Sequence, residues 1–301
     1  MPSPDKNVGT LKKRHGVIFQ LILKRIASRV LKSAKTGAKE MAVFSGSIIG
    51  DLPVPANGSD VLLAACNDAY FRLFALDLIQ SIELLGAPQA VHIHLLDPSD
   101  DVIREAESLR SSLKSVKLTF TADPCALARN LPHRQVYYTA ARFLLAPLIL
   151  KAGAKRLLII DVDAVMNRSP WALFGAQTSA SSGGFIFRRD MKRPWFKVLA
   201  SAVFYNDSPQ SIGLCDALAR SLAATFKYRP KYHIDQILPY FVCTFAKRDV
   251  PNFETFDIPS NIMGYGYEAD AAFWTVKGKS NIDRFLTERS KLLDSTVAAA
   301  I

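Results

Sequence analysis

Short apolar runs alternate with amphipathic stretches along the chain from residue 60 onward. The apolar runs predict strands, and the stretches with apolar residues every three to four positions predict helices. We expect strands at residues 61–66, 91–96, 116–120 and 156–160, and helices at 71–85, 101–113 and 137–152, the last kinked or restarted at Pro147. This alternation is typical of βαβ units, so we predict an α/β fold with a mixed, mostly parallel sheet flanked by helices.

A different pattern occupies residues 1–45, which we interpret as a basic amphipathic arm. Ile18, Ile22, Ile26 and Val30 follow one another at four-residue intervals and form an apolar ridge on a predicted helix. Residues 1–40 also contain ten of the 38 basic residues and only two of the 27 acidic ones. Such a helix either lies on an anionic membrane surface, which would involve residues 12–39, or packs against the domain or a partner.

The arm is followed by a segment rich in glycine and proline at residues 46–59, which predicts a linker. We assign residues 60–285 to one globular domain and residues 286–301 to a C-terminal tail. Because most of the net charge of +11 comes from the arm, the domain itself has no basic excess that would suggest nucleic-acid binding.

The cysteines and the hydropathy suggest a cellular location. Cys66, Cys125, Cys215 and Cys243 lie far apart and form no C-x-x-C pair, which favours a reducing, cytoplasmic setting. We find no apolar run of about 18 residues and no secretion signal. We therefore expect a cytoplasmic protein that, if the arm binds lipid, is peripheral at the inner face of the membrane.

Several common classes of enzyme lack their motifs in this sequence. No G-x-G-x-x-G follows a predicted strand, and no P-loop sequence or G-x-S-x-G elbow occurs. A dinucleotide oxidoreductase, a P-loop NTPase and a serine hydrolase are therefore poorly supported. His92 and His94 face the same side of one predicted strand, and we expect a structural role for both because no metal-ligating partners lie nearby in the sequence.

The strongest candidate for chemistry is the acid pair Asp161 and Asp163, which directly follows the strand predicted at residues 156–160. Open α/β sheets bind ligands at the carboxyl ends of their strands. Two carboxylates at such a position would hold a hard divalent cation and leave coordination positions for phosphate oxygens. In the structural alternative, Asp163 caps the next turn and Asp161 is a solvated strand end.

The same residues also fit the D-x-D-x-T/V motif of haloacid-dehalogenase-like phosphatases, in which Asp161 would be the nucleophile. That family carries its motif on the first strand of the domain and has an acidic pair downstream. Here about a hundred residues of βα units come first, and no Asp-Asp or Glu-Asp pair follows residue 163. The phosphatase is therefore the second enzyme hypothesis.

Five segments together resemble the family 8 glycosyltransferases, which include glycogenin and the bacterial lipopolysaccharide galactosyltransferases. They are residues 63–70 (LAACNDAY), 91–97 (VHIHLLD), 138–143 (YTAARF), 156–165 (RLLIIDVDAV) and 233–238 (HIDQIL). Their order and spacing match over roughly residues 60–280, which is more specific than any single motif. The resemblance implies a GT-A fold and a retaining transfer of a hexose from a UDP-sugar to a carbohydrate or glycoconjugate acceptor.

The resemblance also assigns roles to individual residues. It implies that Asp161 and Asp163 bind Mn²⁺ or Mg²⁺ on the donor diphosphate, and that Asp235 and Gln236 lie beside the transferred sugar as catalytic residues. The implied donor-binding residues are Asp68 and Tyr70 at the base and ribose, Arg142 at the diphosphate, Asp161 at the ribose and sugar, and Asn206 at the sugar or acceptor.

One family motif is incomplete in this sequence. The family's H-x-x-G-x-x-K segment supplies a third metal ligand and a phosphate-binding lysine, but residues 273–279 read FWTVKGK and lack the histidine. We expect Lys277 and Lys279 to bind the diphosphate in its place. Either another residue such as His233 completes the metal site, or the acid pair, water and diphosphate suffice. The missing ligand also leaves open a sugar-nucleotide-binding module without activity.

Overall fold

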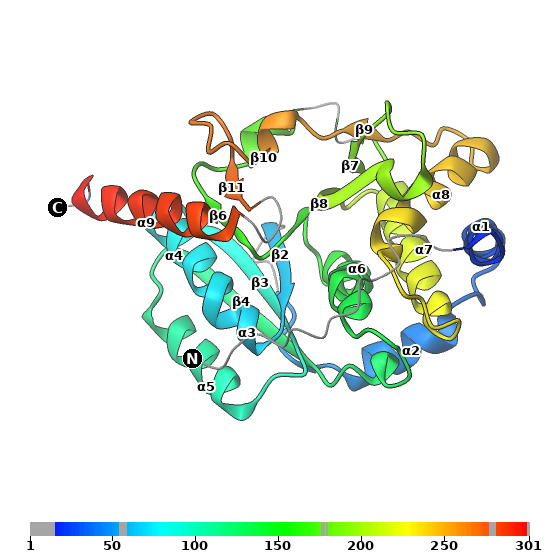
Figure 1. Ribbon diagram of the computed structural model, residues 1–301, viewed down its shortest axis with the longest axis horizontal. Helices are drawn as coiled ribbons and strands as arrows, with labels where there is room; N and C mark the ends of the chain where they lie inside the picture. The colour runs from blue at the N-terminus through cyan, green and yellow to red at the C-terminus, as the bar shows by residue number, and fades with distance from the viewer. Residues whose placement is uncertain (1–15, 54–58, 176–177, 179, 277–280, 300–301) are drawn as a thin grey trace.

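The computed structural model describes residues 16–53, 59–175, 178, 180–276 and 281–299. Its centre is an eight-stranded mixed sheet with helices on both faces (Figure 1). The strand order is β1-β4-β3-β2-β5-β8-β7-β9, and β4, β3, β2 and β5 form a parallel block. The strands are β1 (Ile49–Gly50), β2 (Asp60–Cys66), β3 (Gln89–Leu96), β4 (Val116–Asp123), β5 (Arg156–Ile160), β7 (Gly184–Phe187), β8 (Val198–Asn206) and β9 (Phe256–Asp257).

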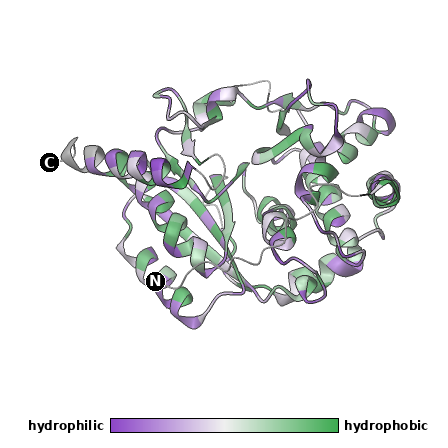
Figure 2. Ribbon diagram, viewed as in Figure 1, coloured by the Kyte–Doolittle hydropathy of each residue, from purple (hydrophilic) through white to green (hydrophobic). Residues whose placement is uncertain are grey.

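Alternate residues of the central strands pack against different helical layers. Leu63 and Ile159 face one core, and Leu62 and Leu158 face the other. The first core is closed by α1 (Val17–Lys32), α6 (Gln135–Lys151), α7 (Pro209–Phe226) and α8 (Ile234–Asp249), and the second by α4 (Leu76–Leu84), α5 (Asp100–Ser112) and α9 (Ile282–Ala299). Figure 2 shows apolar residues concentrated on the central strands and polar residues along the outer helices. The expected α/β fold is therefore confirmed.

The predicted elements are present with small shifts at their ends. β5 has the bounds we expected, and α6 continues through Pro147 as one helix. The helix expected at residues 71–85 is composite, because α3 (Asp68–Tyr70) and a π-helical turn, η1 (Phe71–Ala75), precede α4. Short π-helical insertions of this kind often accompany functional sites. This one lies directly after the segment that we expected to bind the nucleotide.

A second, three-stranded sheet continues from the acid pair. It pairs β6 (Ala164–Met166), β11 (Phe273–Thr275) and β10 (Met263–Gly264) in the order β10-β11-β6. The Thr275 hydroxyl donates a hydrogen bond of 2.9 Å to the backbone carbonyl of Asp163. Residues 263–275 are therefore fixed beside the acid pair, although about a hundred residues separate them in the sequence.

The N-terminal segment packs against the rest of the chain. Leu23, Ala27 and Val30 of α1 are buried in the same core as α6, α7 and α8. The Arg220 guanidinium of α7 donates to the backbone carbonyls of Val30, Ser33 and Thr36, at 3.0 to 3.2 Å. It thereby satisfies carbonyls at the end of α1 that have no partner within the helix. Residues 38–47 form the next helix, α2 (Ala38–Ser47), which also contacts α7.

The predicted apolar ridge of α1 is only partly used in this packing. Ile26 and Val30 are buried, whereas Ile18 is 77% exposed. The inward face instead includes Leu23 and Ala27, because α1 is rotated so that the residues beside the ridge meet α7 and α8. Among the described residues, no helix combines the length and the apolar content that crossing a bilayer requires.

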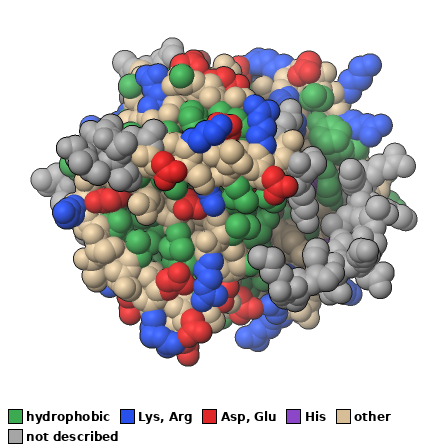
Figure 3. Space-filling model, turned by 60° about the vertical axis from the view of Figure 1, so that its left-hand side comes forward, with side chains coloured by type: hydrophobic (Ala, Val, Ile, Leu, Met, Phe, Trp, Pro, Cys, Tyr) green, Lys and Arg blue, Asp and Glu red, His purple; other side chains and the backbone are tan. Residues whose placement is uncertain are grey.

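The face shown in Figure 3 carries acidic and basic side chains interspersed, with no broad basic patch. Charges of both signs are therefore exposed side by side on this face.

Two leucines of α1 allow a matched test of its packing. We expect Leu23→Ala to lower the free energy of unfolding by about 2–5 kcal/mol, because it leaves a cavity in the core. Leu21→Ala, at a side chain that is 58% exposed, should change it by less than about 0.5 kcal/mol. Urea denaturation of both variants measures the difference. Equal and small effects would mean that α1 does not depend on the core for its position.

Candidate active site

The carboxyl ends of three strands meet at one edge of the main sheet. β5 runs parallel to β2 and antiparallel to β8, and β7 is also antiparallel to β8. β2, β5 and β7 therefore end on the same side, where Asp68, Asp161 and Arg188 follow them within two residues. Ligands of open α/β sheets bind in this position.

Asp161 is held by a buried arginine from the middle of α6. Arg142 forms an ion pair with the Asp161 carboxylate, and only 7% of its side chain is exposed, compared with 34% for Asp161. The same guanidinium donates to the carbonyls of Ala200, at 2.9 Å, and Ile160, at 3.4 Å. Arg142 thus fixes the end of β5 and leaves Asp161 partly open to a ligand. The Arg142 Nε atom is buried and makes no hydrogen bond to any described residue.

Asp163 is the second carboxylate of the pair. Burial, followed by the negative charge of Asp161, raises the pKa of Asp163 to about 7, against the opposing effect of Arg142. Within the described part of the chain, no basic side chain forms an ion pair with Asp163. Since burial and a like charge disfavour the charged carboxylate, a bound cation would stabilise it.

α8 brings a third carboxylate close to the pair. Asp235 is 2% exposed, and its pKa is raised by burial, although His233 and Arg142 lower it. The charge of Asp161 acts in the raising direction, which indicates that the two carboxylates are neighbours. Asp235 Oδ1 is buried without a hydrogen bond to a described residue and lies 3.8 Å from His233 Nδ1. Gln236 follows in the first turn of α8 and is partly exposed.

The segment after β2 contributes Asp68 and Tyr70. Partial burial and the charges of Asp163 and Asp161 raise the pKa of Tyr70, so its hydroxyl faces the acid pair. The Asp68 carboxylate accepts hydrogen bonds from the backbone N–H of Ser99, at 3.2 and 3.3 Å. Tyr70 is 44% exposed and accessible to a ligand.

The structure does not bring Asn206 to this site. Asn206 pairs with Arg156 at the first residue of β5, so it lies at the opposite edge of the sheet from Asp161. It is buried, and its side-chain amide donates to the carbonyls of Thr178 and Ser181. In this structure Asn206 has a structural role and does not make the expected contact with the sugar or acceptor. The pairing register of β8 with β5 places it at that edge of the sheet. The predictions for Lys277 and Lys279 concern residues outside the described part of the chain.

Sequence reasoning missed Arg188, Ser201 and Tyr265, which lie near the acid pair, and Tyr232, which lies near Asp235. The Tyr265 hydroxyl is 3.5 Å from Ser201 Oγ, and the backbone carbonyl of Ser201 accepts from the N–H of Asp161. Burial and the two acids raise the pKa of Tyr265, while Arg188 lowers it. Burial and the charge of Asp235 raise the pKa of Tyr232, and the positive charge of Arg188 acts against them. Arg188 is therefore a second cation near the pair, and its position directly after an apolar strand was its only signal in the sequence.

The acid pair fits a divalent cation of the magnesium type. Such ions are commonly bound by one or two carboxylates, with water and substrate phosphates completing the coordination. Among the residues that the structure describes, no group of three or more His, Cys, Asp or Glu side chains is arranged as a complete metal site. In a site with two carboxylates, water and phosphate oxygens of a ligand would complete the coordination.

His92 and His94 belong to the interior of the sheet. Both are fully buried. The two ring nitrogens of His92 and Nδ1 of His94 lie 2.8 to 3.0 Å from the hydroxyls of Thr119 and Thr121, and His94 Nε2 lies 3.6 Å from Asp123 Oδ2. Burial strongly lowers the pKa of His92, so that ring is neutral. The expected structural role of this pair is confirmed.

Comparisons with known proteins find this fold among solved structures of glycosyltransferases. Neither a protein-family model nor a curated sequence matches the chain. The fold is similar to that of the galactosyltransferase LgtC, solved with donor and acceptor sugar analogues, with a TM-score of 0.54, 14% identity and coverage of 78% of this chain and 95% of that one. An LgtC variant, in which an active-site glutamine is replaced by glutamate, gives a TM-score of 0.51 at 13% identity, covering 77% and 95% of the two chains. The glycosyltransferase GlyE of Streptococcus pneumoniae gives 0.50 at 10% identity, covering 81% and 65%. At these identities the likeness shows a shared fold, and it confirms the expected fold class.

Proposed function

We propose that this protein is a metal-dependent retaining glycosyltransferase that moves a hexose from a UDP-sugar to a carbohydrate or glycoconjugate acceptor. The observation that carries the proposal is the Arg142–Asp161–Asp163 group at the carboxyl edge of a sheet whose fold is shared with LgtC. LgtC was solved with both donor and acceptor sugar analogues, which supports a nucleotide-sugar donor and a carbohydrate acceptor for this fold.

The charges around the acid pair suit departure of a diphosphate. Breaking a glycosyl phosphate bond builds negative charge on the leaving group, which cationic groups stabilise. Mn²⁺ or Mg²⁺ bound by Asp161 and Asp163 would supply Lewis-acid stabilisation of that charge. Arg188 adds a cation beside the pair, and Arg142 orients Asp161. Lys277 and Lys279 remain predicted contacts of the diphosphate.

The positive charge that develops at the anomeric carbon requires groups on the other side of the sugar. Asp235 and Gln236 lie in the first turn of α8. The negative charge of Asp161 contributes to the raised pKa of Asp235, so the two carboxylates interact. The LgtC variant, in which an active-site glutamine is changed, supports a catalytic position for glutamine in this fold. We propose that Gln236 or Asp235 stabilises the oxocarbenium-like sugar.

A screen of UDP-sugars for slow hydrolysis without acceptor tests this proposal. We expect Mn²⁺-stimulated release of UDP from at least one UDP-hexose. Release of phosphate from p-nitrophenyl phosphate that depends on Asp161 would instead favour the haloacid-dehalogenase-like phosphatase. Tight binding of a UDP-sugar with no turnover under any condition would favour the inactive binding module.

We also propose a cytoplasmic location with peripheral contact to anionic membranes through residues 12–39. In support, all four cysteines are unpaired and buried, as in proteins of reducing compartments. On α1, Val17 is 75% and Ile18 77% exposed, next to exposed Lys24 and Arg25. An outward face with apolar side chains beside basic ones is typical of helices that bind the surface of anionic bilayers.

A substitution on this face separates membrane contact from the packing of α1. We expect Ile18→Asp to weaken sedimentation with phosphatidylglycerol vesicles about tenfold, because it removes apolar contact and adds a like charge. Leu85→Asp, at an exposed leucine outside α1, should leave binding unchanged. Equal binding by the wild type and Ile18→Asp would contradict the proposal.

A further inference from the structure

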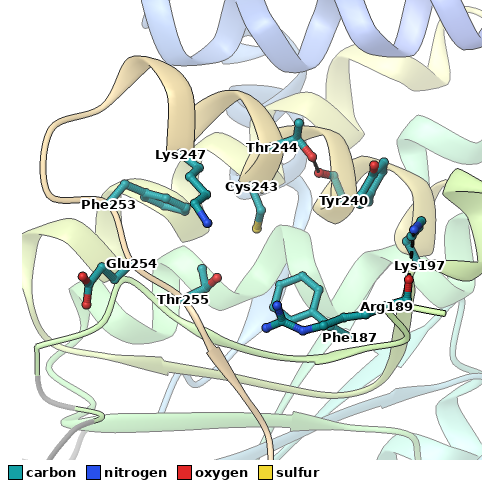
Figure 4. Close-up of a pocket in the computed structure, with 10 residues that line it drawn as sticks. All are labelled: Phe187, Arg189, Lys197, Tyr240, Cys243, Thr244, Lys247, Phe253, Glu254 and Thr255. Atoms are coloured by element: carbon teal, nitrogen blue, oxygen red, sulfur yellow. Dashed lines mark hydrogen bonds between the residues drawn. The ribbon is translucent and has the colours of Figure 1, made fainter. Parts of the chain in front are cut away.

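A cavity of about 600 Å³ lies between α8 and the neighbouring ends of β7 and β8 (Figure 4). Its walls come from residues 187–197, 240–247 and 253–255, and none of these segments carries the acid pair. The lining residues are Phe187, Arg189, Lys197, Tyr240, Cys243, Thr244, Lys247, Phe253, Glu254 and Thr255.

The cavity has an excess of positive charge. Lys247 extends into it from α8, and Arg189 extends toward the same space from the opposite wall (Figure 4). Arg189 is neutralised by Asp257, whose carboxylate accepts a hydrogen bond of 2.7 Å from it. Among the ion pairs of the described residues, none includes Lys247 or Lys197. With Glu254 as the only carboxylate in the lining, one positive charge remains in excess.

The remaining lining combines aromatic faces with hydroxyl groups. Phe187, Tyr240 and Phe253 supply apolar rings, and Thr244 and Thr255 supply hydroxyls. The Thr244 hydroxyl donates to the Tyr240 carbonyl at 2.6 Å, which leaves its oxygen able to accept. Rings that pack against C–H groups, together with hydroxyls and a cation, are suited to a saccharide that carries an anionic group.

α8 connects this cavity to the proposed catalytic centre. Gln236, Tyr240, Cys243 and Lys247 follow at intervals of three and four residues, so they lie on one face of the helix. At 1.5 Å per residue, the cavity residues lie about 6 to 17 Å along the helix axis from Gln236. This span corresponds to one to three sugar units, so a ligand in the cavity can belong to the same oligosaccharide as a hydroxyl that reacts near Gln236.

We propose that this cavity binds a saccharide unit bearing a phosphate or a carboxylate, and that this unit is part of the acceptor. The inference that the bound unit is part of the acceptor rests on the proposed glycosyltransferase function, whereas the binding of an acidic saccharide does not. The protein would thus recognise acidic oligosaccharides by a unit that is distant from the bond that forms.

Binding is tested first, without turnover. In NMR titrations of the isotope-labelled full chain, we expect glucose 6-phosphate and glucuronate to shift signals around Tyr240 and Lys247 at millimolar concentration. Glucose and inorganic phosphate alone should shift them much less. Lys247→Gln should weaken binding of glucose 6-phosphate by about fivefold or more, because a charge-assisted contact is lost. Arg248→Gln is the matched control, since Arg248 is the next residue of α8 and pairs with Asp249.

Three results of the titrations would overturn the site. They are the absence of shifts at the cavity with either acidic sugar, equal binding of inorganic phosphate, and equal losses in Lys247→Gln and Arg248→Gln. Tyr240→Leu gives an independent check, because it removes the aromatic face and leaves the charge. Unchanged binding of glucose 6-phosphate in Tyr240→Leu would contradict recognition of the sugar ring.

Transfer to pairs of acceptors that differ only in charge tests whether the bound unit is part of the acceptor. We expect acceptor oligosaccharides with glucuronate at the end distant from the reacting hydroxyl to have a lower KM than those with glucose there, and Lys247→Gln to abolish this preference. Hydrolysis of the donor without acceptor should be the same in Lys247→Gln and wild type. Equal KM values for the two acceptors would overturn the link to the acceptor. Absence of donor hydrolysis in every protein would instead count against the proposed function and leave the binding result standing.

Discussion

Asp163→Asn is expected to reduce metal-stimulated turnover of the donor at least about a hundredfold, equivalent to about 2.7 kcal/mol of activation free energy. The substitution keeps the shape of the side chain and replaces an anionic oxygen ligand with a neutral amide. Because Asp163 is buried beside Asp161 with a raised pKa, the change also removes a charge that is costly in the metal-free protein. We therefore expect the variant to fold and to be at least as stable as wild type without metal.

The measurements are UDP release in Mn²⁺ and thermal unfolding with and without the ion. Wild type should gain stability from Mn²⁺ with UDP, since a ligand that binds only the folded state stabilises it, and Asp163→Asn should lose most of this gain. Asp101→Asn is the control, because Asp101 is an exposed residue of α5 that pairs with Arg104. Full Mn²⁺-stimulated activity in Asp163→Asn would remove this residue from the metal site.

Arg142→Met is expected to lower the free energy of unfolding by about 3–5 kcal/mol, because it leaves the Asp161 carboxylate without its buried partner. The two backbone carbonyls that Arg142 binds also lose a donor. Removing a buried guanidinium costs more than removing an exposed one. Donor turnover should fall as well, even at temperatures where the variant is folded, because Asp161 is no longer oriented.

Arg134→Met is the matched control for this comparison. Arg134 pairs with Asp97 at 2.7 Å, but about half of each side chain is exposed, so its loss should cost less than about 1 kcal/mol. Urea denaturation of both variants gives the two values. A cost for Arg142→Met as small as that for Arg134→Met would show that Arg142 does not hold the end of β5.

The sequence by itself determined the order of the elements and the position of the acid pair. β5 was predictable because its apolar run is short, continuous and bounded by charged residues. Asp161 follows this strand directly, so a parallel sheet places it at the edge that binds ligands. Arg142 was assigned through the motif resemblance, and the structure adds that it is buried against Asp161. These inferences are local, since each depends on residues close together in the chain.

The tertiary structure decided which distant residues join the pair. Arg188 reaches the site because β7 is parallel to β5, and the pairing of both with β8 is not visible in either strand's sequence. The same register places Asn206 at the opposite edge of the sheet, although the family resemblance implied that it contacts the sugar or acceptor.

The role of α1 was also decided by packing. Its periodicity predicts an amphipathic helix, but a membrane and a protein core both bury an apolar face, so the pattern does not distinguish them. The contacts of Leu23 and Ala27 with α7 and α8, and the bonds from Arg220 to the end of α1, assign its inner face to the core. Local propensity and periodicity are properties of neighbouring residues, whereas register, helix rotation and long-range ion pairs arise only when the chain has folded.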